Sequence, residues 1–157
     1  DGLAGKESAA APGDPLTGQN GWTEAEGCPL YTNDDFPLAA QQFQDLLTKM
    51  PNLDAFAATG GFAQFVPDAN RAATEPFKDK IAKGELAVVY ADTLPTQIDQ
   101  MKEGLSQGQV GQRPYEMGYK SMMALKDLKD GKPGPADPTY TGLDVCTPAN
   151  ADTCIAK

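Results

Sequence analysis

Histidine is absent from this 157-residue sequence. Its absence excludes Ser-His and Cys-His nucleophilic machinery and removes the commonest zinc ligand. The sequence also lacks the GxSxG, P-loop and GxGxxG motifs of hydrolases, phosphate-binding enzymes and dinucleotide-binding folds. We therefore expect no catalytic residue, no metal and no cofactor.

Basic residues are also scarce. Thirteen Lys and Arg stand against 22 Asp and Glu, which gives a formal net charge of −9. We expect no nucleic-acid partner, because phosphate binding relies on clustered Lys and Arg and these are scattered. No run approaches the ~18 apolar residues that a membrane span needs. Hydrophobic residues make up 40% of the sequence, which is ordinary for one globular domain or part of a larger one.

Cysteine occurs three times, at Cys28, Cys146 and Cys154, and never as CxxC, so redox and zinc-finger functions are disfavoured. Cys146 and Cys154 close a short loop near the C-terminus. A disulfide there would stabilise the fold by about 2–3 kcal/mol and would indicate an oxidising compartment. The alternative is a pair of free thiols in a cytosolic protein, and we expect the disulfide.

The chain starts at Asp1 without Met or a secretory apolar segment, which predicts a processed or truncated product. Residues 1–27 are rich in Gly, Ala, Pro and polar groups. They predict a loop that follows the remnant of a helix.

Alternating strand and helix patterns follow from residue 28. Strands are predicted at residues 28–32, 53–59, 85–92, 108–111 and 138–145. Helices are predicted at residues 33–51, 68–83 with a break near Pro76, 94–105, and 114–130. Strands without polar alternation predict an α/β fold, a parallel sheet with helices on both faces. In the last helix, four side chains are expected to face inward: Tyr115, Tyr119, Met122 and Leu125.

Ligands of such sheets bind at the carboxyl ends of the strands, where Thr59-Gly60, Asp92 and Gln112 lie. Asp92 has two interpretations: an N-cap of the following helix, or a carboxylate that accepts hydrogen bonds from ligand hydroxyls. Gln112 is either a solvated loop amide or a combined donor and acceptor for a sugar hydroxyl. The adjacent Asp34 and Asp35 are expected to be helix caps, since glycosidase carboxylates come from separate elements at least ~5 Å apart.

Together these residues resemble a known family. The segment "VVYADTLPTQIDQMKEGLSQGQVGQRPYEMGYKSMMALKDLKDGKP" is similar to the C-terminal part of periplasmic sugar-binding proteins of ABC importers, the ribose and galactose binders and their repressor-like relatives. The shared pattern is an Asp at a strand end, a helix, a Gly-flanked strand, Gln-x-Pro and a helix carrying a Gly. The stretch "LLTKMPNLDAFAATGG" matches the preceding family segment, and the resemblance covers roughly residues 32–145.

The resemblance implies that Asp92 and Gln112 hydrogen-bond sugar hydroxyls. Thr59 and Gly60 stand where the family usually supplies an Asn or Asp, and Asp34 lies near a further contact position. The family has two lobes that clamp the sugar, and this sequence has no counterpart of the N-terminal lobe, so it resembles a fragment. Three parts are implied after residue 27: lobe strands and helices at 28–111, a crossover and a helix packing in the other lobe at 112–131, and a return strand and tail at 132–157.

The function implied is that of a periplasmic, monomeric solute-binding protein. It would bind a sugar or polyol between its lobes and deliver it to the membrane permease of an ABC importer, without enzymatic turnover. One alternative is a sugar sensor of the same fold that presents its ligand to a receptor or kinase. The other is a hydrolase using Asp34, Asp35 or Asp92, which we do not favour. The sugar itself is not identified, because half of the pocket has no counterpart.

Overall fold

The computed structural model describes residues 14–155 of the chain. The chain divides into two units, Asp1–Asn33 and Asp34–Lys157. Among the described residues, no helix combines the length and the apolar character that a membrane crossing requires.

The described part of the first unit contains a short antiparallel hairpin, β1 (Thr17–Gln19) and β2 (Trp22–Thr23). Its turn residues Asn20 and Gly21 have φ angles of 51° and 82°, as a tight hairpin turn requires. The sequence predicted a loop here, although an Asn-Gly pair is the usual signal of such a hairpin. The helix remnant predicted ahead of that loop lies outside the described residues.

The strand predicted at residues 28–32 is wrong. The structure shows no strand there, and among the described residues β1 and β2 pair only with each other. Pro29 has no N–H to donate to a ladder, so this short apolar run has little support for pairing.

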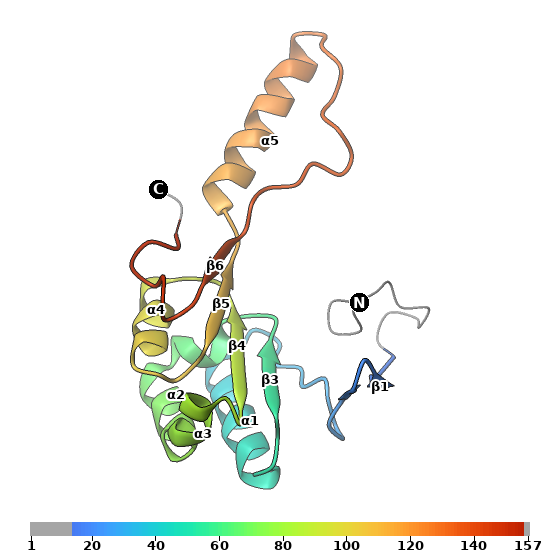
Figure 1. The fold of residues 1–157 in the computed structure, drawn as a ribbon. Helices are drawn as coiled ribbons and strands as arrows, with labels where there is room; N and C mark the ends of the chain where they lie inside the picture. Colours follow the sequence, from blue (N-terminus) through green and yellow to red (C-terminus); the bar gives the residue numbers. More distant parts are fainter. Residues whose placement is uncertain (1–13, 156–157) are drawn as a thin grey trace. The chain divides into compact units, whose positions relative to one another are not determined.

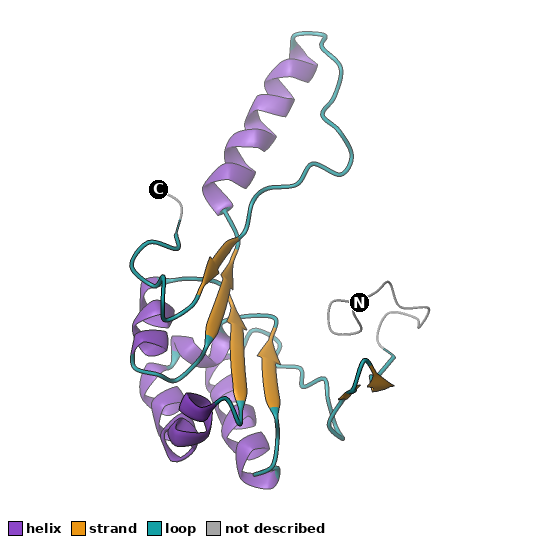
Figure 2. Cartoon of the chain, in the orientation of Figure 1, coloured by secondary structure: helices purple, strands orange, loops and turns teal. Residues whose placement is uncertain are grey.

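The second unit is built on a four-stranded sheet in the order β3 (Ala55–Ala58), β4 (Ala87–Ala91), β5 (Gly108–Gly111) and β6 (Asp144–Cys146). Strands β3, β4 and β5 are parallel, and β6 runs antiparallel to β5 (Figures 1 and 2). The α/β class and the parallel strands are confirmed. The last strand is shorter than predicted and begins only at Asp144.

Four helices belong to this sheet. They are α1 (Phe36–Lys49), α2 (Pro67–Thr74), α3 (Lys78–Lys83) and α4 (Pro95–Lys102). A 3-10 turn, η1 (Phe62–Phe65), precedes α2, and another, η2 (Glu75–Phe77), separates α2 from α3 at the predicted break. Helix α1 begins three residues later than predicted. Of the two expected caps, Asp35 is the N-cap, since its Oδ1 accepts a hydrogen bond of 2.8 Å from the Leu38 amide.

The hydrophobic core lies between one face of the sheet and helices α1 to α4. Phe43 of α1, fully buried, packs on Tyr90 of β4 with ring centroids 6.1 Å apart. The opposite face carries a row of exposed valines from three neighbouring strands: Val89 (38% exposed), Val110 (41%) and Val145 (59%). Helices α1 to α4 therefore cover one face of the sheet, and the prediction of helices on both faces is wrong for the described residues, which leave these valines exposed.

Helix α5 (Pro114–Lys129) follows β5 and leads away from the end of the sheet (Figure 1). Its predicted range is confirmed within one residue, but the inward orientation of its apolar stripe is wrong. No α5 residue is buried, and exposed fractions run from 57% to 84% at Tyr119, Leu125, Met122 and Tyr115. The apolar residues recur with the period of a helix, as predicted, but within the described residues no other element covers them.

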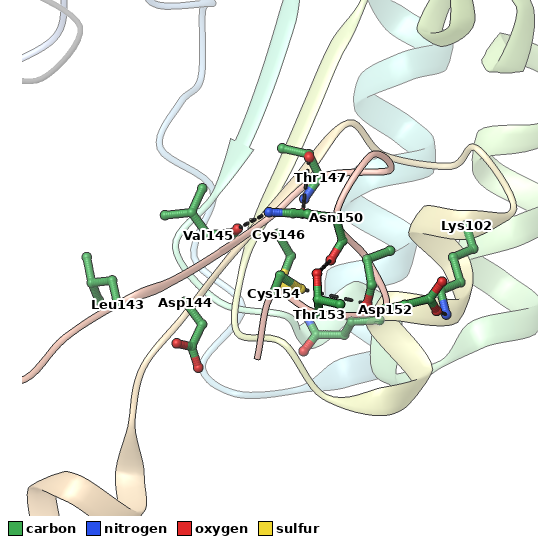
Figure 3. Close-up of a disulfide and its surroundings, with 12 residues drawn as sticks. Lys102, Leu143, Asp144, Val145, Cys146, Thr147, Asn150, Asp152, Thr153 and Cys154 are labelled. Carbon is green, nitrogen blue, oxygen red and sulfur yellow. Dashed lines mark hydrogen bonds and ion pairs between the residues drawn. A yellow bond between two sulfur atoms is a disulfide. The ribbon is translucent and has the colours of Figure 1, made fainter. Parts of the chain in front are cut away.

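The C-terminal loop after β6 is closed by a disulfide between Cys146 and Cys154, whose Cα atoms lie 5.1 Å apart (Figure 3). Asn150 supports the loop from inside, since its side chain donates to the Val145 carbonyl at 3.0 Å and accepts from the Thr147 amide at 2.7 Å. Asp152 pairs with Lys102 of α4. The loop is thereby fixed to both the last strand and α4.

We predict that this disulfide forms in the purified protein. Alkylation under denaturing, non-reducing conditions should modify one cysteine per chain, Cys28, and alkylation after reduction should modify three. Intact mass measures both numbers. Three modified cysteines without reductant, in protein purified without reductant, would contradict the prediction. Loss of the bond should lower the free energy of unfolding by about 2–3 kcal/mol on the loop-closure model.

Candidate ligand-binding site

A cavity of about 700 Å³ opens at the carboxyl ends of β4 and β5. Small-molecule pockets commonly have volumes of roughly 300–1,000 Å³. Its walls come from the β4–α4 turn, the β5–α5 connection, the first residue of β6 and the end of the C-terminal loop. The lining residues are Asp92, Thr93, Leu94, Gln112, Arg113, Pro114, Tyr115, Glu116, Asp144 and Ile155.

Asp92 and Gln112 meet in this cavity. They follow two neighbouring parallel strands, and the Gln112 side-chain amide donates a 3.1 Å hydrogen bond to Asp92 Oδ1. A carboxylate offers about four acceptor positions, and this bond uses one of them. The pair therefore presents carboxylate acceptors beside an amide that both donates and accepts.

The backbone of Asp92 is fixed in an unusual conformation. Its φ angle is 71°, in the left-handed region that residues with a side chain seldom adopt, and its amide donates to the Val110 carbonyl at 2.8 Å. The N-cap of α4 is Leu94, two residues later. The alternative that Asp92 caps this helix is therefore wrong.

Close packing brings the β4–α4 turn onto β5. A Cβ atom at Gly111 would collide with the Thr93 side chain, so this position requires glycine for the two segments to lie so near each other. This close packing of the β4–α4 turn on the end of β5 keeps Asp92 and Gln112, which flank Thr93 and Gly111, near each other.

Arg113 forms a second polar link across the cavity floor. Its Nε lies 2.8 Å from Asp144 Oδ1, and the Asp144 side chain is 5% exposed while that of Arg113 is 35% exposed. The link joins the two chain segments that leave and re-enter the sheet on either side of α5. The link has no signal in the sequence, because Arg113 and its partner Asp144 lie 31 residues apart.

Glu116 lies on the first turn of α5 beside this link. The Lys120 ammonium donates to its carboxylate at 2.5 Å and holds the pKa of Glu116 below its usual value, with smaller help from the Gly142 amide and the Arg113 charge. Arg113, Glu116 and Lys120 thus largely satisfy one another. Asp92 has no such cationic partner among the ion pairs of the described residues.

The other predicted contacts lie outside the cavity lining. Thr59 and Gly60 follow β3, which pairs with β4, so they lie along the same edge of the sheet. Asp34 is exposed and immediately precedes the cap of α1. The structure brings Asp92 and Gln112 together in the cavity, and these three residues are not part of its lining. Within residues 14–155, no group of three or more His, Cys, Asp or Glu side chains is arranged to hold a metal ion.

Parallel strands with an open cavity that holds polar side chains at their carboxyl edge define one lobe of an α/β ligand-binding fold. Residues 9–133 match the family model described as the periplasmic binding protein domain, and the chain belongs to this family. The sheet is a lobe of the type I periplasmic-binding-protein fold. No curated protein sequence gives a significant match.

Solved structures of sugar-transport proteins share this fold. GanP, a glucose-galactose binding protein from Geobacillus stearothermophilus, is 24% identical over 76% of this chain and 40% of its own, with a TM-score of 0.59. A sugar ABC transporter sugar-binding protein from Bacillus halodurans is 25% identical over 78% of this chain and 44% of its own, with a TM-score of 0.58. An ABC transporter solute binding protein from Agrobacterium vitis, bound with alpha-D-tagatopyranose, is 21% identical over 79% of this chain and 39% of its own, with a TM-score of 0.60. The chain thus spans about two fifths of the length of the structures it matches.

Proposed function

We propose that this chain forms the C-terminal lobe of a two-lobed solute-binding protein, which binds a sugar or polyol and delivers it to the permease of a periplasmic ABC importer. The observation that carries the proposal is the Asp92–Gln112 pair at the carboxyl edge of β4 and β5. Sugar hydroxyls need both donors and acceptors, and this pair supplies charged acceptors and a neutral amide within one hydrogen bond of each other.

The charge of the cavity favours a neutral ligand. Among the lining residues that the structure describes, one is cationic, Arg113, and it is already engaged by Asp144 and lies near Glu116. The remaining charge at the β4 end is the carboxylate of Asp92. An anionic ligand such as a sugar phosphate would meet repulsion here, whereas polyhydroxy compounds would donate to this carboxylate.

Transport without turnover suits the same residues. The lining residues that the structure describes include no histidine or cysteine, and the family is a substrate-binding fold. A lobe that covers one side of a ligand binds it weakly, and closure of a second lobe would complete its burial. In this proposal the exposed stripe of α5 packs within that second lobe, and the Cys146–Cys154 disulfide fits a periplasmic location.

A thermal-shift screen of the two-lobed protein tests the proposal. The compounds are neutral monosaccharides, polyols and, as matched controls, the corresponding sugar phosphates. At 100 times its dissociation constant, one neutral compound should stabilise the protein by about 2.7 kcal/mol. The compound should be recovered unchanged after prolonged incubation. Stabilisation by sugar phosphates alone, by none of the compounds, or with chemical turnover would contradict the proposal.

A further inference from the structure

A network of buried amide side chains is hydrogen-bonded to the β4–α4 turn, and the hydrophobic pattern of the sequence did not predict it. Its members come from η1, α2, α4 and β5, and all have exposed fractions of zero: Gln64, Asn70, Gln97, Gln100 and Gln109. Burying an amide is unfavourable unless it is hydrogen-bonded, so a cluster of five requires specific partners.

Gln97 holds the turn that carries Asp92 from both sides. Its Nε2 donates to the carbonyl of Ala91 at 2.9 Å, and its Oε1 accepts from the amide of Leu94 at 3.0 Å. One side chain thus binds the residue just before Asp92 and the residue two positions after it. The hydrogen bond from the Leu94 amide to Gln97 is also a capping interaction, because Leu94 is the N-cap of α4 and Gln97 is the third residue of the helix.

The turn needs such support because Asp92 has its left-handed φ angle of 71°. Asp adopts this conformation more readily than most residues with a side chain, but it still costs energy, which contacts with the surroundings offset. The hydrogen bond from the Asp92 backbone amide to the Val110 carbonyl fixes the turn against β5, and the hydrogen bonds of Gln97 fix the same turn against α4.

Gln97 is itself held in place. Its Nε2 donates to Gln64 Oε1 at 2.8 Å, and the same oxygen accepts from Gln109 Nε2 at 3.1 Å. A Cβ atom at Gly61 would collide with the Gln97 amide, so glycine at this position leaves the room that Gln97 occupies.

From this geometry we infer that Gln97 is a positioning residue for the ligand site. It keeps the Ala91–Leu94 turn in the conformation that directs the Asp92 carboxylate to Gln112 and the cavity, although Gln97 is not part of the cavity lining. The inference rests on the proposed function, because it assigns Gln97 a role in sugar affinity through Asp92.

The test replaces Gln97 by methionine in the two-lobed protein. Calorimetry measures its affinity for D-glucose, D-galactose, D-ribose, D-tagatose and every other neutral monosaccharide or polyol that stabilises the wild type in the thermal-shift screen, each separately. We expect Gln97→Met to weaken the sugar binding shown by the wild type by at least about tenfold, as for loss of one or two hydrogen bonds that orient a charged group. In an Asp92→Ala background the same change should have less than about a threefold further effect, because residues that act as a unit are not additive.

Gln100→Met is the matched control. Gln100 is equally buried and belongs to the same network. Its side-chain amide donates to the backbone carbonyls of Gln64 and Thr96, and not to the turn that carries Asp92. It should lower the melting temperature to a similar degree and leave affinity within about threefold of the wild type. A crystal structure of Gln97→Met should show Asp92 outside the left-handed region or its bond to Gln112 broken.

The outcomes separate the two proposals. A wild-type protein that binds none of the neutral monosaccharides and polyols tested would overturn the proposed function, and this inference with it. Wild-type binding that Gln97→Met leaves unchanged would overturn the inference alone. Equal losses of sugar affinity in Gln97→Met and Gln100→Met would also overturn the inference. So would an undiminished effect of Gln97→Met on affinity in the Asp92→Ala background. Either result would show that Gln97 stabilises the fold without positioning Asp92.

Discussion

Replacing Asp92 by alanine should weaken sugar binding by the two-lobed protein at least about tenfold, and about a hundredfold or more if two ligand hydroxyls bind this carboxylate. Each hydrogen bond to a charged group contributes about 1.5–3 kcal/mol. Calorimetry with the sugar identified by the thermal-shift screen measures the change. Gln112→Ala should cost less, because its hydrogen bonds to a sugar are neutral.

The melting temperature without ligand provides the second readout for this variant. Asp92 is not the cap of α4, so Asp92→Ala should lower stability only slightly. Asp99→Ala removes an exposed carboxylate from the same helix region, outside the cavity lining, and should leave affinity unchanged. A destabilised Asp92→Ala protein with wild-type affinity would contradict the assignment of the site.

Replacing Arg113 by methionine should lower the free energy of unfolding by about 2–3 kcal/mol. The change leaves the Asp144 carboxylate, 5% exposed, without its ion-pair partner. Breaking a fully buried pair costs about 3–5 kcal/mol, and the 35% exposure of Arg113 lets water offset part of this. Urea unfolding of the two-lobed protein measures the loss.

Two further variants test the reason for that loss. Lys126→Met breaks an ion pair with Asp130 on the exposed side of α5 and should change stability by less than about 1 kcal/mol. Adding Asp144→Leu to Arg113→Met should recover part of the lost stability, because no unpaired carboxylate remains buried. Equal losses for Arg113→Met and Lys126→Met would show that the Arg113–Asp144 link contributes no more than a surface pair.

Much of the fold could be predicted because local signals agree with one another. The apolar segments that became β3 and β4 lack polar alternation, which is typical of parallel strands, although helices cover only one face of this sheet. Glycines are the first and last residues of β5. The same strand ends located Asp92 and Gln112, since the carboxyl edge of a parallel sheet is where ligands bind. Position along the chain was sufficient for these conclusions.

The remainder depends on contacts between distant residues. The stripe of α5 has a helical period, but the period does not say which surface it meets, so Tyr115 was expected inside and is 84% exposed. The Arg113–Asp144 pair joins segments 31 residues apart. Gln97 and Gln100 are polar residues of α4 and would be assigned to solvent by any hydrophobic pattern, yet partners in η1 bury both of them.

The most direct test of the central claim is a crystal structure of the two-lobed protein with its sugar bound. The account predicts sugar hydroxyl oxygens within about 2.5–3.0 Å of the Asp92 carboxylate and about 2.7–3.2 Å of the Gln112 amide, between the carboxyl edge of β4 and β5 and the second lobe. A sugar held elsewhere, with Asp92 and Gln112 bonded only to each other, would contradict the claim that this edge of the sheet is the ligand site.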